Sequence, residues 1–305
     1  MLFITIALHA QRFVNTTLDG AQAVYAITQD TSGVVWLGTD NGLYSYDGYH
    51  DYRHFASHTF SHIRINSLGF EGSMLYLATG KGMLKFDTQK GIYASAPAME
   101  SDGDKGRKKA VRELRVLNMK GRKDAFGNEV YAILHTQKGL LVGSLAGLRL
   151  NQRQILLTPG AQPLVNALAY DAKRHCYWIG TEGALYCADQ ALQNFSKIAA
   201  LDGNSVKCLD EDQDGNLYIG TDNGLYRMAM NNSLEHFVHN SRNEATIPNN
   251  IVWSCYVDKW QNVWVGTDHG LSRLSTHTYY RFTSLDKITF SGEGNCLHAI
   301  LQTRS

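Results

Sequence analysis

The chain has 305 residues and a formal net charge of +1 at pH 7, a balance that gives no electrostatic argument for nucleic acid or an anionic membrane as a partner. Hydrophobic residues make up 44% of the chain, enough for a large core, which excludes a disordered protein. No run of 18 apolar residues occurs, so the sequence predicts no membrane-spanning helix. The 28 glycines and 16 tyrosines favour short strands and tight turns.

The first ten residues resemble the end of a secretory signal peptide. Leu2–Leu8 form an apolar run, and small residues at Ala7 and Ala10 precede a cleavage position before Gln11. No basic segment stands in front of the run, and a buried first strand is the alternative interpretation. We expect residues 1–10 to be a signal-peptide remnant and residues 11–305 to form a single folded domain that is exported.

A ten-residue segment recurs along the chain. It reads VWLGTDNGLY at Val35–Tyr44, LYIGTDNGLY at Leu217–Tyr226 and VWVGTDHGLS at Val263–Ser272, with weaker copies at 75–83, 140–148 and 177–185. The Gly-Thr positions or their equivalents begin at 38, 78, 143, 180, 220 and 266. A period near 40 residues with all-β signals is typical of a β-propeller, and the 65-residue step after position 78 marks an insertion.

Each repeat predicts four strands. In the first unit we expect them at Val24–Gln29, Val34–Gly38, Leu43–Tyr46 and near Tyr52–Phe55. In the sixth unit we expect them at Val252–Val257, Val263–Gly266, Leu271–Leu274 and Tyr279–Phe282. The middle strands lack polar alternation, which fits sheets covered on both faces by neighbouring blades. The glycine of Gly-Thr lets adjacent sheets approach, and the aromatic residue two positions earlier supplies contact between blades.

The two ends of the chain extend the pattern. Leu297–Ile300 resembles Val24–Ile27, so a seventh inner strand begins there, but the chain stops at Ser305 before the matching Gly-Thr segment. Arg12–Val14 lies where the outer strand of a preceding blade belongs. We therefore predict an all-β, seven-bladed type of propeller with six complete four-stranded blades and an incomplete seventh. An open gap between blades one and six would leave unpaired edges and make the chain express poorly or oligomerise.

The segment Ile27–Gly48 (ITQDTSGVVWLGTDNGLYSYDG) resembles the two-component regulator propeller repeat. The resemblance runs from about Arg12 to Ser305 and implies the first propeller in the periplasmic sensor region of a hybrid two-component system histidine kinase, anchored to the inner membrane. It implies an oligosaccharide ligand from polysaccharide breakdown, a second propeller and further sensor domains as partners, and a homodimer as one arrangement. The kinase activity of that family belongs to domains outside this chain, so we expect no catalysis here.

The candidate ligand site is a ring of equivalent positions, each following the first apolar residue of an expected inner strand. The ring consists of Tyr25, Asn66, Tyr131, Asn166, Lys207, Trp253 and His298. Inner strands line the channel of a propeller, and aromatic and amide side chains on a fixed frame suit the faces and hydroxyls of sugars. Packing between blades without a ligand is the alternative.

Three further features favour a structural interpretation. Asp210–Asn216 imitates the start of a calcium loop, but Thr221 stands where that loop needs a glutamate, so we expect a solvated turn. The insertion Gly91–Glu129 carries the one basic run, which we interpret as a solvated extension, with contact to a partner or an acidic sugar as the alternative. The five cysteines are odd in number and predict free thiols.

Two other classes of function stay open from the sequence. Propellers also host lyases and hydrolases, and an enzyme would need a converging acid–base or metal constellation. His50, His54, His58 and His62 have four-residue spacing but belong to the outer strand and loop of the first unit, so we expect no metal or other cofactor. An intracellular protein-interaction propeller is the third class, which a true signal peptide would exclude.

Overall fold

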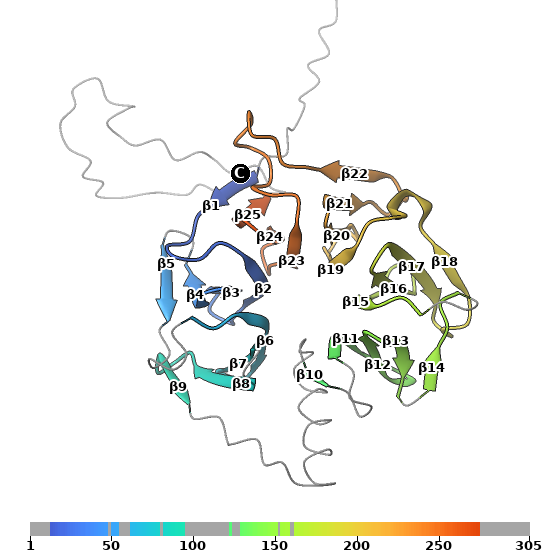
Figure 1. The fold of residues 1–305 in the computed structure, drawn as a ribbon, viewed down its shortest axis with the longest axis horizontal. Helices are drawn as coiled ribbons and strands as arrows, with labels where there is room; N and C mark the ends of the chain where they lie inside the picture. The colour runs from blue at the N-terminus through green and yellow to red at the C-terminus, as the bar shows by residue number, and fades with distance from the viewer. Residues whose placement is uncertain are drawn as a thin grey trace, which may run out of the picture.

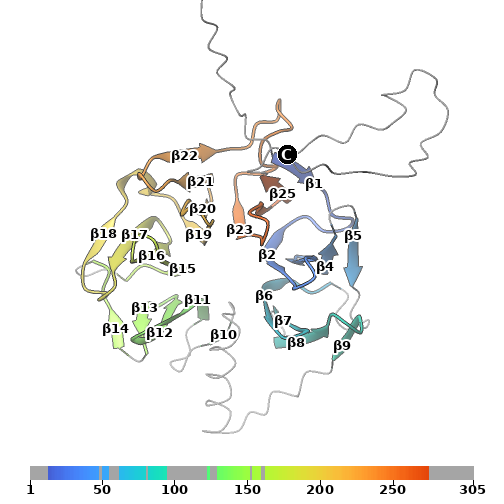
Figure 2. The same ribbon diagram turned by 180° about the vertical axis from the view of Figure 1, so that it is seen from behind.

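The computed structural model describes residues 13–47, 50–54, 62–79, 82–94, 122–123, 129–151, 153–158 and 162–274. These residues form six β-sheets arranged as blades around a central axis (Figures 1 and 2). Five sheets have four antiparallel strands and the sheet of blade three has five. The innermost strand of each blade faces the centre of the ring, as the positions of β2, β15 and β23 in Figure 1 show.

The strands of the first three blades follow the chain. Blade one contains β2 (Val24–Gln29), β3 (Val35–Thr39), β4 (Gly42–Tyr46) and β5 (Asp51–His54). Blade two contains β6 (Ile65–Glu71), β7 (Met74–Thr79), β8 (Gly82–Asp87) and β9 (Ile92–Ala94). Blade three contains β10 (Arg122–Lys123), β11 (Glu129–Thr136), β12 (Gly139–Ser144), β13 (Gly147–Leu150) and β14 (Arg153–Ile155).

The last three blades follow in the same order, and their final strand comes from the N-terminus. Blade four contains β15 (Val165–Asp171), β16 (Cys176–Thr181), β17 (Ala184–Asp189) and β18 (Phe195–Lys197). Blade five contains β19 (Val206–Glu211), β20 (Leu217–Thr221), β21 (Gly224–Met228) and β22 (Leu234–Phe237). Blade six contains β23 (Val252–Val257), β24 (Val263–Thr267), β25 (Gly270–Leu274) and β1 (Phe13–Thr16).

In four blades an aspartate holds the turn between the first two strands of the repeat. In blade six, Oδ1 of Asp258 accepts hydrogen bonds from the backbone amides of Trp260 and Asn262, and Oδ2 accepts one from Nε1 of Trp264 at 2.9 Å. Equivalent aspartates bond the aromatic residue of the second strand in three other blades, through the pairs Asp30–Trp36, Asp171–Trp178 and Asp212–Tyr218. The aromatic residues of the repeat are therefore structural. The calcium-like segment is also a capped turn, although its central carboxylate, on Asp212, is buried instead of solvated.

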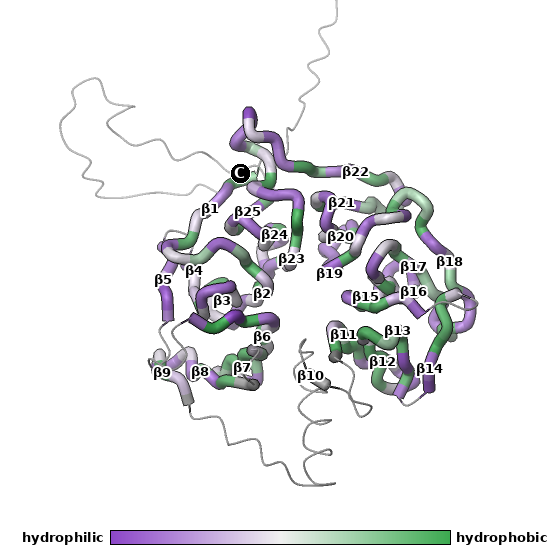
Figure 3. Tube along the Cα trace, in the orientation of Figure 1, coloured by the Kyte–Doolittle hydropathy of each residue, from purple (hydrophilic) through white to green (hydrophobic). Residues whose placement is uncertain are grey.

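Each glycine of Gly-Thr lies against the first residue of the next inner strand. A Cβ on Gly38 would come within 2.8 Å of Cγ2 of Ile65, and a Cβ on Gly220 would come within 2.6 Å of Cγ1 of Val252. Real Cβ atoms do not approach this closely, so glycine sets the distance between the sheets. The hydropathy of the strands fits blades that are stacked on each other. The covered strand β12 is hydrophobic, whereas the outer strand β5 is hydrophilic (Figure 3).

Closure of the ring differs from the prediction. Strand β1 pairs with β25 from Phe13↔Leu274 to Thr16↔Leu271, so the N-terminal strand completes blade six and not a seventh blade. Val24, Leu37 and Trp264 pack in one buried cluster between blades six and one. The seventh blade and the open gap between blades one and six were therefore wrong for the described residues, because β1 takes the edge that we had assigned to Tyr279–Phe282. Tyr279–Phe282, Leu297–Ile300 and residues 1–12 lie outside the described part of the chain.

The junction between blades two and three is the irregular one. Each of the other five junctions has a hydrophobic cluster that joins two neighbouring blades. Here the described residues form two separate clusters, Tyr76 with Ala78 in blade two, and Val130 with Ile133 and Val142 in blade three. The predicted insertion falls at this point, and apart from 91–94, 122–123 and Glu129 it lies outside the described residues.

The four cysteines in the described part of the chain are free, as predicted. Cys176, Cys187, Cys208 and Cys255 are free thiols, and Cys296 lies outside the described residues. In the register of blade four, Cys176 faces Asp189 and Cys187 faces Trp178, so the two cysteines of that hairpin are not directly opposite each other.

Candidate functional site

Each of the six inner strands has a β-bulge near its first residue. In blade one Val24 pairs with Thr39 and Ala26 pairs with Gly38, which leaves Tyr25 as an extra residue on the inner strand. The same shift occurs in the other five blades. The extra residues are Tyr25, Asn66, Tyr131, Asn166, Lys207 and Trp253. A bulge re-aims a side chain and leaves its residue outside the ladder, so each blade presents one side chain near the same end of the channel.

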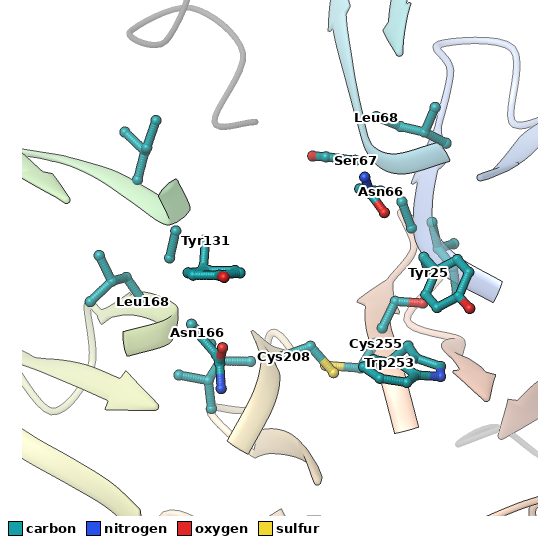
Figure 4. Close-up of a pocket in the computed structure, with 17 residues that line it drawn as sticks. Tyr25, Asn66, Ser67, Leu68, Tyr131, Asn166, Leu168, Cys208, Trp253 and Cys255 are labelled. Atoms are coloured by element: carbon teal, nitrogen blue, oxygen red, sulfur yellow. The ribbon is translucent and has the colours of Figure 1, made fainter. Parts of the chain in front are cut away.

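A central cavity of about 210 Å³ lies at this end of the channel, and all six inner strands contribute to its lining (Figure 4). Five of the seven predicted site residues line it: Tyr25, Asn66, Tyr131, Asn166 and Trp253. Lys207 occupies the remaining bulge, in blade five, and its Nζ lies 4.7 Å from the centroid of the Trp253 ring. His298 lies outside the described residues.

Aromatic side chains lie on opposite sides of this cavity (Figure 4). The rings of Tyr25 and Trp253 lie 5.4 Å apart on one side, and Tyr131 lies on the other side (Figure 4). Nε1 of Trp253 donates a hydrogen bond to Oδ1 of Asp268 at 3.0 Å, which fixes the orientation of the indole. Burial raises the pKa of Tyr25 above its usual range, against the opposing effect of the nearby Arg64 charge, so this phenol stays a hydrogen-bond donor at neutral pH.

A polar cluster lies on the side formed by blades four and five. Oε2 of Glu182 accepts hydrogen bonds from Oγ of Ser205 at 2.8 Å and from Nδ2 of Asn166 at 3.2 Å. The Ser205 hydroxyl is the main reason that the pKa of Glu182 lies below its usual range, and the Asn166 amide and the Lys207 charge add to it. Glu182 is therefore an ionised hydrogen-bond acceptor beside the channel at neutral pH.

Two kinds of residue at this end of the channel were not predicted from the sequence. Asp40, Glu182, Asp222 and Asp268 each follow the Thr of a Gly-Thr segment, and Arg64 precedes β6 by one residue. A signal for the acids was present, because Thr39 pairs with Val24 and the residue after Gly-Thr must lie at the bulged end of the inner strand. Arg64 belongs to a loop and had no such signal.

The lining of the cavity is uncharged and partly aromatic. The described residues contribute phenol, indole, carboxamide, hydroxyl, thiol and aliphatic groups to it, and none of them contributes a carboxylate or an imidazole. Small residues such as Ala26, Ala167 and Ser254 follow the bulges and pair with the glycines of the second strands, which leaves room at the centre. Across the described ranges, no group of three His, Cys, Asp or Glu side chains has the arrangement of a metal site.

The sequence profile of the two-component regulator propeller matches the chain at residues 19–41, 200–223 and 246–269. In these three segments the chain is similar to the two-component regulator propeller repeat. The matched segments belong to blades one, five and six, which are the units with the strongest sequence repeat.

Solved structures are also similar to the chain. The extracellular domain of BT4673 from B. thetaiotaomicron, described as a proposed hybrid two component system, is 28% identical with a TM-score of 0.74, and the match covers 93% of this chain and 42% of that one. The extracellular domain of BT3049 from the same organism, described in the same way, is 16% identical with a TM-score of 0.61, covers 90% and 44%, and shows the fold alone. YCF48 bound to D1 peptide shares the fold at 11% identity and a TM-score of 0.63, over 89% of this chain and 99% of that one.

The chain thus spans less than half of the two extracellular domains that it matches. No curated protein matches the sequence. None of the described segments is a helix long and apolar enough to cross a membrane.

Proposed function

We propose that this propeller is the ligand-sensing part of a periplasmic receptor of the hybrid two-component type, and that its channel binds an oligosaccharide. The observation that carries the proposal is the ring of six bulges, which presents aromatic, amide and cationic side chains at one end of the channel. A scaffold that repeats the backbone but varies the side chain at one position is suited to ligand recognition.

The composition of the cavity supports a saccharide in particular. Aromatic faces at Tyr131 and Trp253 can stack on sugar rings, and the amides of Asn66 and Asn166 can exchange hydrogen bonds with hydroxyl groups. The absence of a carboxylate or imidazole from the described lining favours binding over acid–base catalysis.

In the proposed receptor this domain is the first of two propellers, and ligand binding at its channel is passed to the further sensor domains and the kinase. The extracellular location of the BT4673 domain and its greater length support this arrangement. A homodimer of the receptor is the assembly we propose for signalling, and sedimentation of the whole receptor with and without ligand tests it.

Isothermal titration calorimetry with a panel of oligosaccharides tests the binding proposal. We expect one ligand to release heat, and Trp253→Ala or Tyr131→Ala to weaken it at least about tenfold, because each substitution removes a stacking surface. Trp260→Ala is the matched control, since Trp260 is also in blade six but lies in the turn at the opposite end of β23. Equal losses in Trp260→Ala and Trp253→Ala, or no heat with any saccharide, would contradict the proposal.

A further inference from the structure

Two cations converge on the aromatic pair at the channel. Cζ of Arg64 lies 3.8 Å from the centroid of the Tyr25 ring and 6.0 Å from that of Trp253. On the other side of the pair, Nζ of Lys207 lies 4.7 Å from the Trp253 ring. Arg64 comes from the loop before β6 and Lys207 from the bulge of β19, so blades two and five direct their positive charges to one place.

Three carboxylates near the aromatic pair accept hydrogen bonds from groups of the protein. Oδ1 of Asp40 accepts from the backbone amides of Gln22 and Ala23 at 3.1 and 3.2 Å. Asp268 accepts from the indole of Trp253, and Glu182 accepts from Ser205 and Asn166. These three carboxylates therefore accept hydrogen bonds from neighbouring backbone amides and side chains.

The guanidinium of Arg64 differs from them. It is exposed, and within the part of the chain that the structure describes it forms neither a hydrogen bond nor an ion pair; its contacts are the two ring contacts. A guanidinium stacked on an aromatic face keeps its N–H donors in its own plane, where they match the paired oxygens of a carboxylate or a sulfate. The stacking on Tyr25 thus orients an unused, planar anion receptor beside the sugar-binding surfaces.

We propose that Arg64 recognises a negatively charged group, a carboxylate or a sulfate, on the saccharide that enters the channel, so that the ligand class is an acidic oligosaccharide. This inference rests on the proposed function, because the charged group is part of the same ligand whose rings stack on Trp253 and Tyr131. Lys207 adds positive potential near Trp253, and the acids Asp40, Glu182 and Asp268 disfavour an anion beside themselves, which leaves the neighbourhood of Arg64 as the favourable place for it.

Calorimetry with three length-matched probes separates the possible charges: a digalacturonate, a sulfated galactose disaccharide and the neutral galactose disaccharide. We expect one of the two acidic probes to bind at least about tenfold more tightly than the neutral one, as hydrogen bonds to charged groups do. Which acidic probe binds more tightly tells a carboxylate from a sulfate. Raising the ionic strength from about 0.05 M to about 0.3 M should weaken the acidic probe and leave the neutral one unchanged.

Substitutions at Arg64 then test the residue itself. Arg64→Gln should remove the preference for the acidic probe while the affinity for the neutral probe stays the same, and Arg64→Lys should restore part of it. Lys259→Gln is the control, because Lys259 also lies over an exposed ring, that of Trp260, but at the opposite end of the blade. The melting temperature of each variant shows that it is folded.

The outcomes separate this inference from the function on which it rests. Neutral probes that bind as tightly as acidic ones, or an acidic preference that survives Arg64→Gln, would overturn the role of Arg64 and leave saccharide binding intact. Failure of all three probes and of the wider panel to bind would overturn both.

Discussion

Two junctions of the ring show what holds neighbouring blades together. Between blades six and one, a Cβ on Gly266 would come within 2.5 Å of the carbonyl oxygen of Val24, and Trp264 packs with Leu37 in a shared buried cluster. Between blades two and three, Ala78 stands in the glycine position, and it shares a cluster with Tyr76 but with no described residue of blade three. The step between the repeats is 65 residues there, against 37 to 46 elsewhere.

The glycine of Gly-Thr marks the junctions at which neighbouring blades share a buried cluster. At five junctions a glycine lies against an isoleucine or valine of the next inner strand. One of them is the junction between blades six and one. At the sixth the glycine is missing from the sequence and the shared cluster is missing from the described structure. Within the described residues, the irregular junction is therefore the one beside the insertion.

Truncation of Phe13, the buried aromatic residue of β1, should have the largest effect on stability. Phe13 is 3% exposed and its ring lies 5.4 Å from that of Phe237, so Phe13→Ala should lower the free energy of unfolding by about 3–5 kcal/mol. Val14→Ala is the control, because Val14 is the next residue of β1 and is 47% exposed. Urea unfolding of both variants measures the difference, and equal small losses would show that β1 does not close blade six.

A smaller effect should follow from a methyl group at the closed junction. Gly266→Ala places a Cβ against the backbone of Val24 and should cost about 2 kcal/mol as overpacking. The reverse change at the equivalent position, Ala78→Gly, should cost under about 1 kcal/mol, the usual penalty for glycine in a strand. Chemical denaturation compares the two, and a Gly266→Ala variant as stable as the parent would remove the steric basis of the comparison.

The smallest effect concerns a polar contact across another closed junction. Burial raises the pKa of Asp210 to about 6, and Oδ2 of this carboxyl accepts a hydrogen bond from the Val257 amide of the next blade at 2.6 Å. Between pH 4 and pH 6 the native protein therefore binds more protons here than the unfolded chain, so this group makes stability fall as the pH rises through that window.

Asp210→Asn keeps an acceptor and removes the titration. At pH 7 the relief of a buried charge and the loss of a charge-assisted hydrogen bond oppose each other, so we expect a net change within about 1 kcal/mol. The curve of unfolding free energy against pH should become flatter between pH 4 and pH 6. An unchanged slope would mean that Asp210 does not carry this proton.

Much of the fold could be predicted from the sequence. The repeat gave the inner strands of blades one and six at their observed bounds, because β-branched runs between turn residues leave little freedom. Closure was placed wrongly because the sequence predicts an outer strand at Arg12–Val14 but not which edge it joins. Backbone pairing decides that, and Leu274 faces Phe13 only in the folded ring.

The candidate site could be predicted in part for a related reason. Equivalent positions in a repeat share one backbone geometry, so six ring residues fell on six bulges although no bulge was expected. Arg64 could not be found in this way, because its position on Tyr25 depends on how the loop before β6 crosses from one blade to the next.

The most direct test of the account uses the five tryptophans of the chain, Trp36, Trp178, Trp253, Trp260 and Trp264. In protein labelled with 5-fluorotryptophan, a bound saccharide should shift the ¹⁹F resonance of Trp253 in the channel. The resonances of Trp36, Trp178 and Trp264, which are buried against the aspartates of their turns, and of Trp260 at the opposite end of blade six should stay in place. A saccharide that binds and leaves the Trp253 resonance unmoved would contradict the channel site.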